Sequence, residues 1–161
     1  MSEAVEVPGR RPAVQRRSQV TASRVLDAAQ TLGVSVIASE QYPRGLGPTL
    51  GPIREKLDGA ASRIHEKTTF DALGDDAIRV AVAEARERRR SCVVVGMETH
   101  VCVYQTARAL VQAGWTVHVV TDAVASRTED NRRAGLELCS RAGAYPTVTE
   151  TVVFDWLEVA G

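Results

Sequence analysis

A cysteine and a lysine are the two residues of this sequence with the clearest capacity for chemistry. Cys102 follows a short apolar run at residues 92–95 and lies at the start of a segment, 101–113, whose apolar residues recur with helical spacing. Unpaired N–H groups and the dipole at the start of a helix favour a thiolate, so Cys102 is a candidate nucleophile. The same segment also fits the alternative that Cys102 is a small core residue.

Lys67 is the second candidate, at the end of a weak strand expected over residues 63–66. It is one of only two lysines, while the other basic residues are all arginines. An ammonium near Cys102 would stabilise the thiolate and the negative charge that develops in acyl transfer. No residue of the pattern itself offers a base for the thiol proton.

The elements that must position these residues alternate along the chain. Helices are expected over 13–32, 75–90, 101–113, 130–142 and 150–157, with one helical turn at 53–57. Strands are expected over 34–38, 63–66, 92–95, 116–120 and 147–149. This alternation predicts an α/β fold, a Rossmann-like three-layer sandwich with a mostly parallel sheet. Because carboxyl ends of parallel strands share one edge, the loop 39–52 and the segments 67–70 and 97–102 should lie on one rim.

Composition narrows the class of protein. The length of 161 residues predicts a single domain over 1–161, with residues 1–12 as a loosely attached arm. A formal net charge of zero argues against nucleic-acid and membrane partners. The three cysteines have no metal-ligand spacing, there is no glycine-rich phosphate loop, and no secretory signal or membrane span is apparent. These features predict a cytoplasmic protein with no cofactor and no metal.

Four segments together resemble one known family, the isochorismatase-like cysteine hydrolases. The segments are SEQYPRGLGPT (39–49), HEKTTF (65–70), VVVGMETHVCVYQTA (93–107) and VVTDAVASR (119–127). The family includes nicotinamidase and N-carbamoylsarcosine amidohydrolase, and its fold is a six-stranded parallel sheet between helices. The resemblance implies a hydrolase that cleaves a small amide or carbamoyl-type C–N bond through a cysteine thioester. It also implies a small-molecule substrate and a homo-oligomer.

The resemblance also assigns roles to individual residues. Active members use an Asp-Lys-Cys triad, and Cys102 and Lys67 match two of its members. Backbone N–H groups of Glu98 and Cys102 would form the oxyanion hole, next to a cis peptide at Met97–Glu98. His100 and two aromatic residues are expected at the substrate pocket, although ordinary packing explains each of them as well; the aromatic residues are Tyr42 and Phe70.

The triad aspartate has no match in this sequence. In the family it ends a strand that lies between the strands expected here at 34–38 and 92–95. Without that strand, both neighbours would have an unpaired edge, and the thiol would have no base. One explanation is that the true start lies upstream of the recorded one, which we favour because the match is otherwise intact. The alternative is a truncated, inactive member that acts as a binding or scaffold subunit.

Overall fold

The structure is a computed structural model that describes residues 13–59 and 64–158, so the arm expected at 1–12 lies outside the described residues. The helices are α1 (Ala13–Thr31), α2 (Pro43–Leu46), α3 (Gly51–Gly59), α4 (Asp76–Arg86), α5 (Tyr104–Gln112), α6 (Glu129–Arg141) and α7 (Thr149–Leu157). Two short turns are η1, a 3₁₀ turn (Ala72–Gly74), and η2, a π-helical turn (Thr99–Val103). The strands are β1 (Ala38–Gln41), β2 (Ile64–Lys67), β3 (Ser91–Met97), β4 (Thr116–Ala125) and β5 (Tyr145–Thr147).

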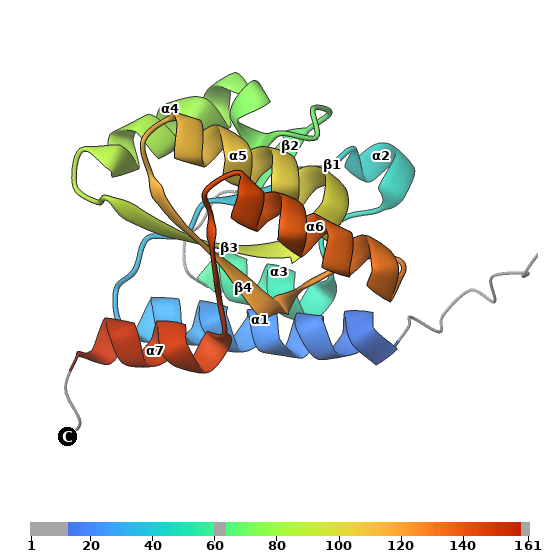
Figure 1. Cartoon of the computed structure of the whole chain (residues 1–161), viewed down its shortest axis with the longest axis horizontal. Coiled ribbons are helices and arrows are strands. Elements are labelled where there is room, and N and C mark those ends of the chain that lie inside the picture. The colour runs from blue at the N-terminus through green and yellow to red at the C-terminus, as the bar shows by residue number, and fades with distance from the viewer. Residues whose placement is uncertain (1–12, 60–63, 159–161) are drawn as a thin grey trace, which may run out of the picture.

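Helices cover both faces of the strands, as the alternating pattern predicts. Figure 1 shows α1 and α7 on one side of β3 and β4, and α4, α5 and α6 on the other. Each side has its own buried cluster. The larger joins α5 and α6 to β4 and includes Ala107, Leu110, Val117, Val119 and Cys139. The smaller joins α1 and α7 to the opposite face of β4 and includes Ala22, Val25, Val120, Ala123 and Val152. The α/β class is therefore confirmed, with every strand pair parallel.

The described strands form two sheets instead of one. One sheet has the order β1-β2 and the other has the order β3-β4-β5. Within the described ranges, no hydrogen-bonded pairing joins the two sheets. One edge of β3 and one edge of β1 therefore have no strand partner in this part of the chain.

The open edge of β3 changes how well its side chains are buried. Residues 92–95 are the apolar, β-branched run that is typical of a fully buried parallel strand. They are nevertheless only partly buried, whereas Val117, Val119 and Val120 of the neighbouring strand β4 are at most 1% exposed. The sequence of β3 is thus that of a central strand, while its surroundings in the described structure are those of an edge strand.

Several element boundaries differ from those expected. The strand expected at 34–38 lies at Ala38–Gln41, because pairing with Ile64–Lys67 and not local hydrophobicity sets its position. The loop expected at 39–52 consequently contains strand residues, all of α2 and the start of α3. The strand expected at 116–120 continues to Ala125. Its pairing with β3 is irregular between Val119 and Val124, where β4 has three more residues than the facing part of β3.

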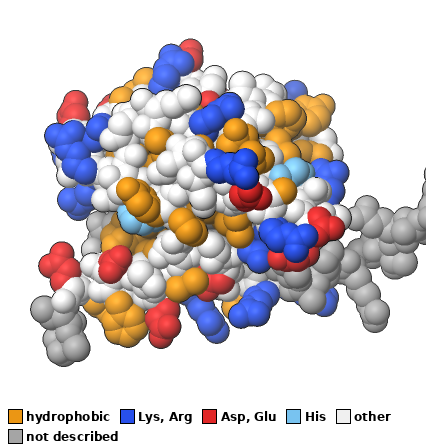
Figure 2. Space-filling view, viewed as in Figure 1, with side chains coloured by type: hydrophobic (Ala, Val, Ile, Leu, Met, Phe, Trp, Pro, Cys, Tyr) orange, Lys and Arg blue, Asp and Glu red, His pale blue; other side chains and the backbone are white. Residues whose placement is uncertain are grey.

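Side chains of both charge signs are interspersed with apolar ones over the face seen in Figure 2. This distribution agrees with the equal numbers of acidic and basic residues, 20 of each. No helix within residues 13–59 and 64–158 is long and apolar enough to cross a membrane.

The two cysteines of the core give a prediction for alkaline pH. Burial raises the pKa of Cys92 to about 12 and that of Cys139 to about 11, from an ordinary value of 9.0. Between pH 9 and these values the unfolded chain binds fewer protons than the folded one, so the free energy of unfolding must fall as pH rises. We expect the urea midpoint to decrease above pH 9, and to decrease less steeply in a Cys92→Ala, Cys139→Ala double variant. Cys102→Ala is the control, and an unchanged slope in the double variant would contradict the assignment.

Candidate active site

Cys102 lies in the π-helical turn η2, between the carboxyl end of β3 and the start of α5. A cis peptide bond joins Met97 to Glu98 at the start of this turn, as the family resemblance predicts. The carbonyl oxygen of Glu98 accepts hydrogen bonds from the N–H groups of Val101 and Val103, both at 3.1 Å. The segment Glu98–Val103, called the nucleophile turn below, is therefore wider than the ordinary first helical turn expected from the sequence.

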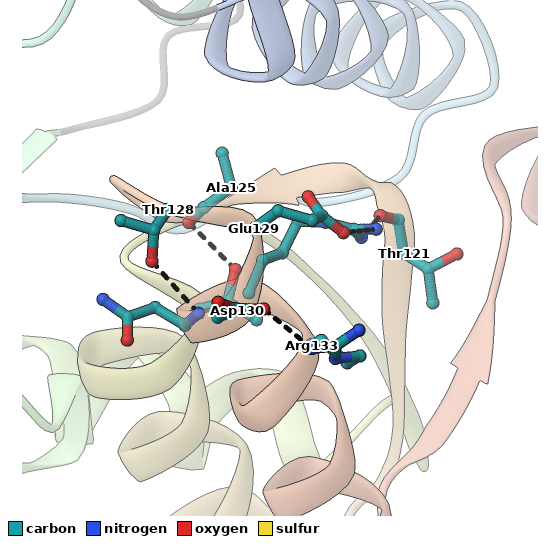
Figure 3. A network of polar contacts seen from close by, with 9 residues as sticks. Thr121, Ala125, Thr128, Glu129, Asp130 and Arg133 are labelled. Atoms are coloured by element: carbon teal, nitrogen blue, oxygen red, sulfur yellow. Dashed lines mark hydrogen bonds and ion pairs between the residues drawn. The ribbon is translucent and has the colours of Figure 1, made fainter.

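Thr99 anchors the nucleophile turn to the end of β4. Its side chain is fully buried, and its hydroxyl donates to the carbonyl oxygen of Ala125 at 2.9 Å (Figure 3). Its N–H donates to the hydroxyl of Ser126 at 3.1 Å. The same hydroxyl lies 3.1 Å from Nδ1 of His100. The hydroxyl and the N–H of this buried residue are thus satisfied, which fixes the backbone three residues before Cys102.

Helix α6 holds the other side of the nucleophile turn. Its N-terminus is capped by the Thr128 hydroxyl, which accepts from the N–H of Asn131 at 3.2 Å. Arg132 donates to the carbonyl oxygen of Thr121 at 2.8 Å and forms a bidentate pair with Glu129, which ties α6 to β4 (Figure 3). A Cβ atom on Gly135 would lie 2.5 Å from the backbone nitrogen of His100. Only glycine allows α6 to approach the turn this closely.

The side chain of Glu98 fastens the nucleophile turn to the loop after β4. Its Oε2 accepts from the N–H of Arg127 at 3.0 Å and lies 3.6 Å from the Nε of the same residue. The same oxygen is 3.7 Å from Nδ1 of His100. His100 therefore faces Glu98 and Ser126 with this nitrogen.

Lys67 is the last residue of β2 and is only 6% exposed. Its Nζ donates to Oε1 of Gln41 at 2.5 Å and to the carbonyl oxygens of Thr69 and Phe70 at 2.8 and 3.1 Å. Three acceptors match the three protons of an ammonium group. Burial lowers the pKa of Lys67, and the nearby acidic groups, Cys102 foremost, offset part of this effect.

Gln41 contacts both Lys67 and Cys102. Its Nε2 donates to the carbonyl oxygen of Thr68 at 2.6 Å, and its Oε1 lies 4.0 Å from Sγ of Cys102. Lys67 and Cys102 are thereby placed on either side of one amide oxygen. No carboxylate of the described residues forms an ion pair with Lys67.

The loop after β1 borders this arrangement and is held by a buried glutamate. Glu40 accepts from the N–H and the hydroxyl of Thr49, both at 2.8 Å, and lies 3.6 Å from Arg54. These hydrogen bonds, the backbone one first, lower the pKa of Glu40. Tyr42 and Phe70, expected at the substrate pocket, are 52% and 53% exposed. Tyr42 directly follows Gln41, which accepts a hydrogen bond from Lys67, and the carbonyl oxygen of Phe70 itself accepts from Lys67.

Two residues of this arrangement were missed by sequence reasoning. The sequence predicts Gln41 in a loop, because it predicts the preceding strand at 34–38, whereas Gln41 is the last residue of β1. Gly135 stands alone in the middle of a helical segment, where glycine costs about 1 kcal/mol relative to alanine. That cost is the signal that could have indicated a packing constraint.

Among the described residues, no group of three or more His, Cys, Asp or Glu side chains is placed to hold a metal ion.

The structure is a parallel α/β fold with a cysteine on a strand-to-helix turn, and one glutamine contacts both this cysteine and a buried lysine. Comparison with known families finds that the Isochorismatase domain matches residues 5–151. The chain therefore belongs to the isochorismatase family. It is 38% identical to the isochorismatase domain-containing protein 1 of Danio rerio over 145 residues, which cover 89% of this chain and 50% of the relative. The matched part of the chain spans about half to two thirds of the length of these curated relatives.

Solved structures show the same fold. The MAR1 ribonuclease of Caenorhabditis elegans has a TM-score of 0.77 and 33% identity, covering 88% of this chain and 71% of that one. The YcaC gene product of Escherichia coli, described as an octameric hydrolase of unknown specificity, has a TM-score of 0.82 and 20% identity. Its match covers 89% of this chain and 70% of that one, and it supports the fold alone.

The close approach of α6 gives a direct test of how the nucleophile turn is held. We expect Gly135→Ala to lower the free energy of unfolding by about 1–3 kcal/mol, because the added methyl group overlaps backbone atoms that cannot move aside alone. Alkylation of Cys102 should change as well, since the turn must shift. Gly51→Ala is the matched control, because nothing lies within 4 Å of its added Cβ. Equal unfolding midpoints for the two variants would show that α6 does not constrain the turn.

Proposed function

We propose that this chain carries the nucleophile and the lysine of an isochorismatase-family hydrolase that cleaves a small amide or carbamoyl-type C–N bond. The observation that carries the proposal is the convergence of Cys102 and Lys67 on Gln41 at the carboxyl ends of the strands. In open parallel sheets this edge is where ligands bind. The family resemblance and the presence of the cysteine support covalent chemistry.

The reaction would proceed in two stages. The Cys102 sulfur attacks the carbonyl carbon, a C–S bond forms, and the carbonyl oxygen becomes an oxyanion. Collapse of this intermediate breaks the C–N bond, and the leaving nitrogen takes the proton that the thiol gave up. Water then hydrolyses the thioester to a carboxylic acid, or to a carbamic acid from a carbamoyl substrate, and restores the cysteine. The N–H groups of Glu98 and Cys102 would stabilise the oxyanion, and the Lys67 ammonium would stabilise the thiolate.

The base would be a carboxylate that none of the described residues supplies to Lys67, and the sheet order suggests its position. The order β2-β1 followed by β3-β4-β5 corresponds to a doubly wound sheet of order 3-2-1-4-5-6 in which the position between β1 and β3 is not filled by a described strand. A strand paired with both edges would end beside Lys67 and Cys102, and a carboxylate at its end would complete the triad. It would also bury residues 92–95 on both sides.

A second candidate function follows from the absence of an ion-paired carboxylate at Lys67 among the described residues. In that case the chain is an inactive member that serves as a binding or scaffold subunit. Homo-oligomer formation fits either function, and a structural neighbour is described as an octamer.

Selective alkylation separates the two candidates. At neutral pH we expect iodoacetamide to modify Cys102 at least about tenfold faster than Cys92 or Cys139, because burial raises the pKa of both other thiols. Peptide mass spectrometry measures the three rates in one sample. Equal, slow modification of all three would contradict an assembled nucleophile.

Turnover completes this test. A panel of small primary amides and N-carbamoyl compounds is screened for acid release, and an acyl adduct on Cys102 is sought by intact mass. Activity should be lost in Cys102→Ala and retained in Cys92→Ala. Fast alkylation of Cys102 without any turnover would favour the inactive subunit.

A further inference from the structure

We infer that Gln41 is a positioning residue that keeps Lys67 charged and directed at Cys102. Of the described side chains, it is the one whose hydrogen bonds and contacts reach both residues, through a single oxygen atom. The inference deepens the proposed function and rests on it. Gln41 would be required for the reactivity of the thiol although it takes no part in bond making.

Strand pairing fixes the reach of Gln41. Gln41 and Lys67 are the last residues of β1 and β2, and they are partners in the parallel register. Neighbouring residues in register project to the same face of a sheet. The meeting of the two side chains therefore depends on the β1–β2 pairing and not on a mobile loop.

The hydrogen bonds also determine which way the amide faces. Its Nε2 donates to the carbonyl oxygen of Thr68. The amide oxygen of Gln41 could not take the place of Nε2 there, because it has no proton to donate. The opposite orientation would place two N–H donors against the Lys67 ammonium and an oxygen against the Thr68 carbonyl. Oε1 must therefore face Lys67 and Cys102.

The charge on Lys67 depends on its three acceptors. Two of them are backbone carbonyl oxygens, of Thr69 and Phe70, so Gln41 supplies the only side-chain acceptor among the described residues. Burial already disfavours the ammonium form. A lost acceptor leaves a buried N–H unsatisfied and disfavours the charged form further. A neutral lysine would no longer stabilise a thiolate at Cys102.

The simpler role for Gln41 is structural support of the turn at Thr68. That role predicts a change in stability when Gln41 is replaced, but no change in the protonation of Lys67. Titration of Lys67 therefore distinguishes positioning from support.

The chain makes this titration accessible because it has only two lysines, Lys56 and Lys67. Lysine labelled with carbon-13 at Cε gives two NMR signals, which Lys67→Arg assigns. Gln41→Met retains the length of the side chain and removes both hydrogen bonds, whereas Gln41→Glu retains an acceptor and adds a negative charge. We expect the titration midpoint of Lys67 to fall by about one pH unit in Gln41→Met and to rise in Gln41→Glu. The Lys56 signal serves as the internal reference.

Alkylation of Cys102 reports the consequence for the nucleophile. Gln41→Met should move the pH profile of Cys102 alkylation to higher pH and slow the reaction about tenfold at neutral pH. Gln112→Met, at an exposed position of α5, is the matched control and should leave the profile unchanged. Circular dichroism establishes that each variant is folded, and Gln41→Glu provides a test if Gln41→Met is not.

The outcomes separate the two proposals. Slow Cys102 alkylation in the unsubstituted protein overturns the proposed function, whatever Gln41 does. Fast alkylation in the unsubstituted protein, with an unchanged Lys67 midpoint and unchanged or faster alkylation in Gln41→Met, overturns the role of Gln41 alone.

Discussion

A buried ammonium group is the constraint around which this site is built. An ammonium that leaves water must find an acceptor for each proton, and Lys67 finds three neutral oxygens. Two come from the backbone turn that follows β2, and the third comes from the partner residue on β1. Three features therefore act together to satisfy the ammonium group: the pairing of β1 with β2, the course of the turn after β2 and the orientation of the Gln41 amide. A different part of the chain, the nucleophile turn, places the thiol of Cys102 next to that amide.

The nucleophile turn depends on backbone contacts to a degree that its sequence does not indicate. Thr99 donates from its hydroxyl and its N–H to Ala125 and Ser126 at the end of β4, and Glu98 accepts from the N–H of Arg127 in the loop that follows. Helix α6 closes the remaining side through Gly135. These contacts surround the turn on the side of β4 and α6, whereas the edge of β3 opposite β4 has no strand partner among the described residues. The described site is thus rigidly supported on one flank and has an unpaired strand edge on the other.

The sequence predicts much of this arrangement and misses specific parts for physical reasons. Alternating elements and the rule that parallel strands share a carboxyl edge were enough to bring Lys67 and Cys102 into one region. The strand position of Gln41 is not predicted, because the apolar residues 34–37 indicate a strand, while the actual strand is the less apolar segment that pairs with β2. The π-helical turn is not predicted either, because apolar spacing cannot distinguish a widened turn from an α-helical one. The close approach at Gly135 depends on tertiary packing, which local patterns do not contain.

An irregularity in the pairing between β3 and β4 divides β4 into two parts, one before and one after residues 120–123. The first half pairs with β5 as far as Val120 and Thr147, and the second resumes pairing with β3 only at Val124. Among the described residues, the hydrogen bonds that join β4 and its following loop to the nucleophile turn come from Ala125, Ser126 and Arg127, at or just after the end of the second half. Local opening of β5 and α7 would therefore leave the nucleophile turn in place, so slow amide exchange near Cys102 can coexist with fast exchange at the carboxyl end of the chain.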